Sequence, residues 1–392
     1  MRDPSFGGGS ISTPGNVSRG NFMRNAVFGV ISIALFLIVA PLSAHHSPAA
    51  KFDPAKAVTL TGVVTQIDWL NPHVHILMNA QGTNPPTNWA IELESVVDLR
   101  RSGWTHDTVK IGDAVTVQGM AARDGTPTAW GNSVVLNSTG RRVFTVTPAQ
   151  PPSEQAAQPT PRWPDGQPRL GPPPGQIMGY WGFPSATTLV QQGANIPADQ
   201  YGILRNLADI DKVAPFQRWA RDLYELRQRN FLKDDPMFIF CKPQAGPRIF
   251  QLPYGVQFLE ERDHKRIRVM MGAGNQNWHF IYTDGRALTA FPKEDADNPL
   301  YWGHALGKWE GDTLVVDTRN FNDSFWFSNG GLPHTQQLHL IERFSRPDLN
   351  TLRYDVTIDD PGAYTRSWSS GWTLKWVANE ELPIYYCQDN RT

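Results

Sequence analysis

Apolar and polar residues alternate with a period of two along many short stretches of this chain, which is the pattern of half-buried β-strands. In the stretch 337–344, for example, Leu338, Leu340 and Phe344 share one face with Glu342. If that face points inward, Glu342 is a carboxylate among apolar groups, and its pKa rises unless a partner compensates for burial. The pattern therefore predicts a β protein with a charged group inside its second half.

The first group of predicted strands falls within residues 45–147. Five stretches rich in β-branched and aromatic residues alternate with turn residues: Val58–Trp69, Val74–Met78, Asn88–Leu93, Ala114–Met120 and Ser133–Leu136. A short helix is predicted at Val97–Ser102, and Gly112-Asp113 forms a turn before the fourth strand. This combination predicts a small closed barrel of the oligonucleotide-binding type (OB-like), a fold that carries many functions and proves none.

The second group of predicted strands falls within residues 237–392. It contains about eight stretches: Gly255–Glu260, Arg266–Met271, Asn277–Tyr282, Leu306–Trp309, Thr313–Thr318, Gln337–Phe344, Thr351–Ile358 and Trp372–Val377. Turn signals between them favour antiparallel neighbours, and about eight antiparallel strands enclose room for one small ligand. We expect a lipocalin-like antiparallel β-barrel, with a β-sandwich as the alternative.

Two different segments separate these groups. Residues 148–175 contain ten prolines in 28 residues, a composition typical of an extended spacer. Residues 176–236 form a connecting segment in which apolar residues recur at helical spacing after Pro215, so a helix is expected there. A shorter helical piece is expected at Asp199–Asp209.

The amino-terminal 44 residues have the features of a leader with a secretory signal peptide. Met23 is an alternative start, Arg24 supplies positive charge, and the apolar run Ala26–Ala40 is shorter than the roughly twenty residues of a membrane span. Small residues up to Ala44 suit cleavage. We therefore expect a periplasmic or secreted protein without a stable membrane span after cleavage; an uncleaved anchor is the alternative.

The amino-acid composition limits the classes of partner that we expect this chain to bind. The chain has 36 basic and 37 acidic side chains, so it lacks the positive charge that nucleic-acid binding normally requires. Fourteen tryptophans and nineteen phenylalanines either fill cores or line ligand clefts. The leading hypothesis is a protein that binds a small apolar or aromatic molecule in its barrel. The candidate ligand-binding residues are tryptophans of that domain: Trp278, Trp302, Trp309, Trp372 and Trp376.

An enzyme is the second hypothesis. His279, His304 and His334 are candidates for general acid/base catalysis with Glu342, Asp317 or Asp360 as partner. Such a site would suit an isomerase, hydratase or lyase without a cofactor. For each histidine the alternative is a structural or surface imidazole. Local motifs of hydrolases, zincins and nucleotide-binding proteins are absent from the sequence.

A copper or zinc site is the third hypothesis. Cleavage after Ala44 would make His45 the first residue, with its free amine and ring nitrogen available to a metal, and His46 follows it. His73 and His75 lie two residues apart on one strand face and supply further nitrogen. The alternative is a frayed tail beside two histidines on a hydrated sheet face.

The two cysteines of the chain are Cys241 and Cys387. An exported chain with two thiols is normally oxidised, so we expect a disulfide that joins the two ends of the second barrel domain. Catalysis by a thiol is the alternative, although the spacing of the two residues matches no redox motif.

Residues 45–145 resemble an exported bacterial domain family whose members have no assigned function. The resemblance rests on five short elements: His45-His46-Ser47, Phe52-Asp53, Gly62, Trp69-x-Asn71-Pro72-His73 and Gly112-Asp113. Histidines at the processed end and in the Asn-Pro-His element are part of it, which favours the metal hypothesis, but it implies no catalytic residues. The part after the spacer is similar to exported proteins of environmental bacteria.

Overall fold

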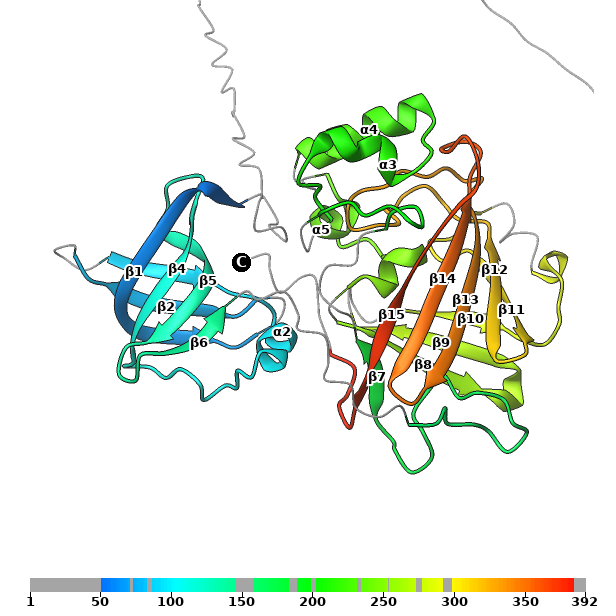
Figure 1. The fold of residues 1–392 in the computed structure, drawn as a ribbon, viewed down its shortest axis with the longest axis horizontal. Coiled ribbons are helices and arrows are strands. Elements are labelled where there is room, and N and C mark those ends of the chain that lie inside the picture. The colour runs from blue at the N-terminus through cyan, green and yellow to red at the C-terminus, as the bar shows by residue number, and fades with distance from the viewer. Residues whose placement is uncertain are drawn as a thin grey trace, which may run out of the picture. The chain divides into compact units, whose positions relative to one another are not determined.

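The computed structural model shows a predominantly β protein, which confirms the predicted fold class. It describes residues 51–70, 73–82, 87–145, 158–182, 189–198, 202–230, 234–252, 254–272, 277–291 and 298–383. The strands form a near-closed ring in the first part of the chain and a closed barrel in the second (Figure 1). Within the described ranges, no helix combines the length and apolar character needed to cross a membrane.

The first sheet contains six strands: β1 (Phe52–Asp68), β2 (His75–Ala80), β3 (Thr87–Glu92), β4 (Ala114–Ala122), β5 (Thr128–Leu136) and β6 (Arg141–Thr145). Their order is β3-β2-β1-β4-β5-β6, and a parallel pairing between β3 and β5 bends the first five strands into a near-closed ring. Helix α2 (Val96–Arg101) follows β3 and begins after Ser95, whose hydroxyl accepts a hydrogen bond from the Asp98 amide. This arrangement agrees with the predicted OB-like barrel.

Alternation within the strands builds the core of this ring. Val74, Ile76 and Met78 are fully buried, whereas His73 and His75 lie on the opposite face of the same segment. The side chains of these two histidines are 12% and 37% exposed. The predicted placement of both imidazoles on one face is therefore confirmed.

The second structure is a closed barrel of nine strands. Its strands are β7 (Gly179–Gly182), β8 (Val256–Glu261), β9 (Arg266–Met271), β10 (Trp278–Tyr282), β11 (His304–Glu310), β12 (Thr313–Arg319), β13 (His339–Asp348), β14 (Thr351–Asp359) and β15 (Trp368–Ala378). Around the barrel the order is β10-β11-β12-β13-β14-β15-β7-β8-β9. All neighbours are antiparallel except β10 and β11, which are parallel. Closure excludes the sandwich alternative.

Strand β7 is the ninth strand, and it was not expected. It lies in the segment that the sequence assigned to a helical connection, yet it pairs with β15 and β8. Residues 158–175 also differ from the predicted spacer. Leu170 is fully buried in the barrel core, and the carbonyl of Arg169 accepts a hydrogen bond from Arg346 at 2.7 Å. This proline-rich stretch is part of the barrel structure because its backbone groups find partners there.

Aromatic rings fill part of the barrel interior. On β13, Leu340 and Phe344 are fully buried and face inward together with Glu342. Tyr354 on β14 packs against Phe344 and against Phe250, with ring centroids 5.1 and 4.6 Å apart. The predicted faces of these two strands are confirmed, because period-two alternation is decisive where only one face is buried.

Short helices cover one end of the barrel (Figure 1). They are α3 (Ile210–Val213), α4 (Arg218–Arg229) and α5 (Pro236–Phe240), with single-turn helices η1 (Leu207–Asp209), η2 (Gly246–Phe250), η3 (Arg262–His264) and η4 (Leu288–Ala290) elsewhere in the domain. The helix expected after Pro215 is α4, whose Ala220 and Tyr224 join the barrel core. The piece expected at Asp199–Asp209 is helical only from Leu207, within the residues that the structure describes.

The start of α5 contains a buried ion pair. Asp235 caps this helix by accepting a hydrogen bond from the Met237 amide at 3.0 Å. Its carboxylate also pairs with both terminal nitrogens of Arg248, one of them at 3.0 Å. Both side chains are essentially inaccessible to solvent, so each charge depends on the other.

Candidate functional site

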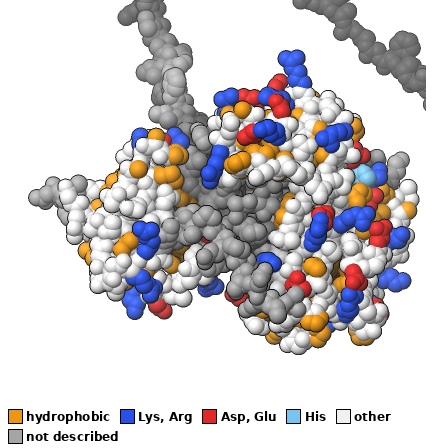
Figure 2. All heavy atoms as spheres, viewed as in Figure 1, with side chains coloured by type: hydrophobic (Ala, Val, Ile, Leu, Met, Phe, Trp, Pro, Cys, Tyr) orange, Lys and Arg blue, Asp and Glu red, His pale blue; other side chains and the backbone are white. Residues whose placement is uncertain are grey.

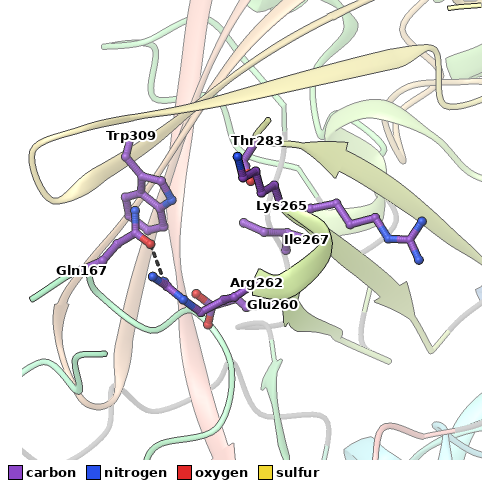
Figure 3. A pocket seen from close by; sticks show the side chains of 8 residues that line it. Gln167, Glu260, Arg262, Lys265, Ile267, Thr283 and Trp309 are labelled. Atoms are coloured by element: carbon purple, nitrogen blue, oxygen red, sulfur yellow. Dashed lines mark hydrogen bonds between the residues drawn. The ribbon is translucent and has the colours of Figure 1, made fainter. Parts of the chain in front are cut away.

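A pocket of about 180 Å³ lies at the end of the barrel where β8 turns into β9. Eight side chains line it: Gln167, Glu260, Arg262, Lys265, Arg266, Ile267, Thr283 and Trp309. In Figure 3, Trp309 and Gln167 stand on one side of the space, and Lys265, Ile267 and Thr283 stand on the other. The pocket thus combines an indole and an aliphatic wall with a hydroxyl and several charged groups.

Glu260 is a firmly held carboxylate in this pocket. It accepts hydrogen bonds from the amides of Leu170 and Gly171 at 3.0 and 3.2 Å, and from the indole of Trp163 at 2.9 Å. Burial raises the pKa of Glu260, although these hydrogen bonds offset part of the rise. Because its oxygens are already occupied, Glu260 fixes the proline-rich segment against the barrel.

Three cationic side chains surround the same pocket, and they differ in their partners. Arg262 pairs with Asp165, and Arg266 pairs with Glu261 at 2.5 Å. Lys265, in the turn between β8 and β9, has no ion-pair partner in the part of the chain that the structure describes. Its ammonium is therefore the charge that remains available to a bound anion. On the face of the molecule drawn in Figure 2, basic and acidic side chains lie interspersed.

Glu342 lies inside the barrel, as its position on β13 predicted. It accepts a hydrogen bond from the Tyr354 hydroxyl at 2.8 Å, and Thr318 Oγ1 is 3.4 Å from its other oxygen. Burial raises the pKa of Glu342 to about 7, because these two hydrogen bonds only partly stabilise the carboxylate. The pKa of this carboxyl group thus lies near neutral pH, and the group is enclosed by the core.

The three predicted catalytic histidines contact different groups. The ring of His304 stacks on Phe291 with centroids 4.0 Å apart, and His334 Nε2 is 2.9 Å from the carbonyl oxygen of Phe325. His279 pairs across strands with a buried position of β9, and burial lowers its pKa to about 4. Their joint action with Glu342 in acid/base chemistry stays a prediction.

Besides Glu342, the two other carboxylates proposed as partners of these histidines have contacts of their own. Asp360 accepts hydrogen bonds from the Thr335 amide and hydroxyl, both at 2.6 Å, and from the Gly362 amide at 3.1 Å. Asp317 contacts Nε2 of His339 at 3.0 Å on the outer face of the barrel. Asp360 therefore stabilises the turn that contains Pro361 and Gly362.

Among the predicted ligand-binding tryptophans, Trp309 lines the pocket. The indoles of Trp302 and Trp372 donate hydrogen bonds to backbone carbonyls at 2.7 and 2.9 Å, so they have structural partners. Trp376 is nearly buried and belongs to the core, and Trp278 is 51% exposed. The presence of an indole did not by itself distinguish Trp309, which lines the pocket, from the other four tryptophans.

A second group of titratable side chains lies on the first ring. Glu92 contacts His73 Nδ1 at 2.5 Å, Lys51 Nζ at 3.0 Å and His75 Nε2 at 3.7 Å. Burial alone would raise the pKa of Glu92, but its bond to His73 and the nearby positive charges lower it well below its usual value. Burial likewise opposes charge on His73, yet Glu92 raises its pKa overall. This buried carboxylate connects both imidazoles with the first described residue of the chain.

Several predictions concern residues that the structure does not describe. His45, His46 and the signal peptide precede the described residues, and Cys387 follows them. The disulfide with Cys241 therefore stays a prediction. Within the described ranges, no three His, Cys, Asp or Glu side chains are arranged to hold a metal ion. A metal site would need donors in addition to His73 and His75.

By its fold, this chain is a β-barrel protein with buried aromatic clusters that follows a near-closed antiparallel ring. Residues 34–131 match the model of DUF6152, a family of unknown function. The matched region includes most of the ring and the segment before it, in agreement with the resemblance seen there. No curated protein matches the chain, and no solved structure matches it.

The sequence identified one of the eight pocket residues, Trp309, and missed the other seven; Glu260 and Lys265 were missed for different reasons. Glu260 is in phase with the buried Val256 and Phe258 on β8, so the alternation that identified Glu342 also marks Glu260. Lys265 carried no such signal. It belongs to a tight turn with φ of 48°, and its place across the pocket from Trp309 depends on how the barrel closes.

Proposed function

We propose that the protein is exported and that its nine-stranded barrel binds a small organic anion with an aromatic or apolar body. The ligand would occupy the pocket beside Trp309. This proposal keeps the predicted class of ligand and adds a negative charge to it. It also moves the site from the middle of the barrel to one end.

The observation that carries the proposal is the free ammonium of Lys265, which lies across the pocket from the indole of Trp309. The neighbouring guanidinium groups of Arg262 and Arg266 already have carboxylate partners, so they contribute positive potential but are held in place. An anion that reaches Lys265 would gain a charge-assisted hydrogen bond in a partly enclosed site. The Thr283 hydroxyl can provide a second polar contact.

The apolar part of the ligand follows from the opposite walls of the pocket. Trp309 and Ile267 offer a flat ring and a branched aliphatic side chain. A volume of about 180 Å³ is below the 300 to 1,000 Å³ of pockets for drug-sized ligands, so the ligand must be small. A single-ring aromatic carboxylate has the required size, shape and charge.

Calorimetric titration with benzoate and phenylacetate tests the proposal, with benzyl alcohol as the uncharged analogue. We expect saturable binding of the carboxylates, and the alcohol should bind at least about 10-fold more weakly because one charge-assisted hydrogen bond is worth about 1.5–3 kcal/mol. Quenching of tryptophan fluorescence should accompany binding and should disappear in the Trp309→Leu variant.

Lys265→Gln is the decisive variant, and Lys308→Gln is its matched control. Lys308 neighbours Trp309 in sequence but is exposed on the outer face of β11. We expect the first change to weaken carboxylate binding about 10-fold or more and the second to leave it unchanged. Equal affinities of both variants for the two carboxylates, or no saturable binding by the parent protein, would refute the proposal.

A further inference from the structure

We infer that Arg262 limits the length of the ligand in the pocket beside Trp309, because its side chain forms a wall between that pocket and the indole of Trp163. The inference rests on the proposed function and narrows its class of ligand to carboxylates with a single aromatic ring. It assigns specificity to a residue that the proposed function treats only as a source of positive potential.

The wall is a contact between two segments that are distant in the sequence. Arg262 lies in the turn between β8 and β9, and its Nη1 donates a hydrogen bond to Oε1 of Gln167 at 2.6 Å. Both side chains line the pocket, and the dashed line in Figure 3 joins them. A hydrogen-bonded pair of side chains therefore bounds the pocket at this point, and shortening one of them would open it.

Three contacts hold the guanidinium of Arg262 in this position. Besides its bond to Gln167, it pairs with Asp165 through Nη2, and it lies over the ring of Trp163, 4.9 Å from the ring centroid. A guanidinium that pairs with a carboxylate and stacks on an aromatic ring is well fixed in orientation. The side chains of Arg262 and Asp165 are 36% and 52% exposed, so this ion pair contributes little to the stability of the fold. Replacing Arg262 should therefore change the shape of the pocket and leave the barrel folded.

The partners of Arg262 belong to a hairpin that is itself fixed to the barrel. Arg162 and Pro168 pair across this hairpin, and the amide of Trp163 donates a hydrogen bond to the carbonyl of Gln167 at 2.9 Å. The indole of Trp163 also donates to Glu260 at 2.9 Å. Since Glu260 lines the pocket, the indole of Trp163 lies directly behind the wall.

This arrangement limits the size of the ligand. A volume of about 180 Å³ accommodates one aromatic ring beside Trp309, and a second ring that extends toward the hairpin would meet the guanidinium of Arg262. A steric barrier of this kind excludes the longer ligand without strengthening the contacts to the shorter one. Without the guanidinium, the pocket would extend to the ring of Trp163, on which a second ring could stack.

Calorimetric titration of the full chain with benzoate and with biphenyl-4-carboxylate tests the inference. We expect the parent protein to bind benzoate at least about 10-fold more tightly than the two-ring acid. In Arg262→Ala, the affinity for the two-ring acid should rise at least about 10-fold, because the second ring gains an aromatic contact and buries apolar surface. The affinity for benzoate should change less than about 5-fold, because Lys265 remains and an exposed charge contributes little.

Two further variants serve as controls. Arg162→Ala changes an arginine of the same hairpin that pairs with Asp312 and does not line the pocket, so it should keep the selectivity of the parent. Arg262→Met removes the charge but keeps much of the bulk, so it should bind the two-ring acid more weakly than Arg262→Ala does.

The outcomes separate the inference from the function on which it rests. Equal affinity of the parent for both acids, or an Arg262→Ala variant with the selectivity of the parent, would overturn the inference and leave the proposed function standing. A parent protein that binds neither acid would refute the proposed function, and the inference with it.

Discussion

Replacing Glu342 with glutamine should stabilise the barrel at neutral and alkaline pH, because the carboxylate of Glu342 is buried with only two polar contacts. A glutamine side chain has nearly the same shape. Its carbonyl can accept the Tyr354 hydrogen bond, and its amide can donate to the hydroxyl of Thr318. The substitution therefore removes the ionisation and keeps the packing.

The magnitude follows from the pKa of Glu342, which is about 7 in the folded chain against an ordinary value of 4.5. Between these pH values the folded protein retains a proton that the unfolded chain has lost, so the free energy of unfolding falls as pH rises. At about 1.4 kcal/mol per pKa unit, the parent protein loses about 3 kcal/mol by the time the pH exceeds 7. Below pH 4.5 this contribution vanishes.

Urea unfolding of parent and variant between pH 4 and 9 measures the effect. We expect the two proteins to be similar near pH 4 and to differ by about 3 kcal/mol near pH 8, with the variant more stable. Glu310→Gln is the control, because Glu310 is 48% exposed on the outer face of β11. A Glu342→Gln variant that keeps the pH dependence of the parent would refute the reasoning.

Three further predictions follow. Tyr354→Phe removes the hydrogen bond to Glu342, so the loss of stability with pH should have a higher midpoint; an unchanged midpoint in urea unfolding would contradict this. Asp235→Ala removes the carboxylate that pairs with the buried guanidinium of Arg248 and should lower the free energy of unfolding by about 3–5 kcal/mol, whereas a loss below about 1 kcal/mol would show that the pair is dispensable. The native protein should contain no free thiol by chemical titration, and Cys241→Ser should lower the free energy of unfolding by about 4–5 kcal/mol.

The barrel could be predicted largely from alternation. On β13 and β14 the apolar positions recur every second residue, and the structure buries the same faces, with Glu342 among them. Such a pattern lies within a single strand, so the sequence of each strand alone indicates which of its faces points inward. The sequence therefore contained the fold class, most of the strands and one buried carboxylate.

The remaining features depend on contacts between distant segments. Strand β7 has four residues, too few to show a period, and it is defined by pairing with β15 almost two hundred positions later. Leu170 is buried although its neighbours suggest an extended spacer, because Glu260 accepts the hydrogen bond from its amide. Which residues line the pocket also depends on contacts between distant segments. For this reason the sequence could name Trp309 only as one of five candidate tryptophans.

The length of the pairing between neighbouring strands differs around the barrel. Among the described residues, β7 and β8 share one aligned residue pair and β10 and β11 share two, whereas β9 forms five with β10 and six with β8. Strands β8, β9 and β10 therefore constitute a three-stranded flap between two short seams. Six of the pocket residues belong to this flap or adjoin it: Glu260, Arg262, Lys265, Arg266, Ile267 and Thr283. Trp309 on β11 stands across the seam between β10 and β11. A ligand bound between Trp309 and the flap residues would hold the flap against the rest of the barrel. We expect such a ligand to slow amide hydrogen exchange along both seams.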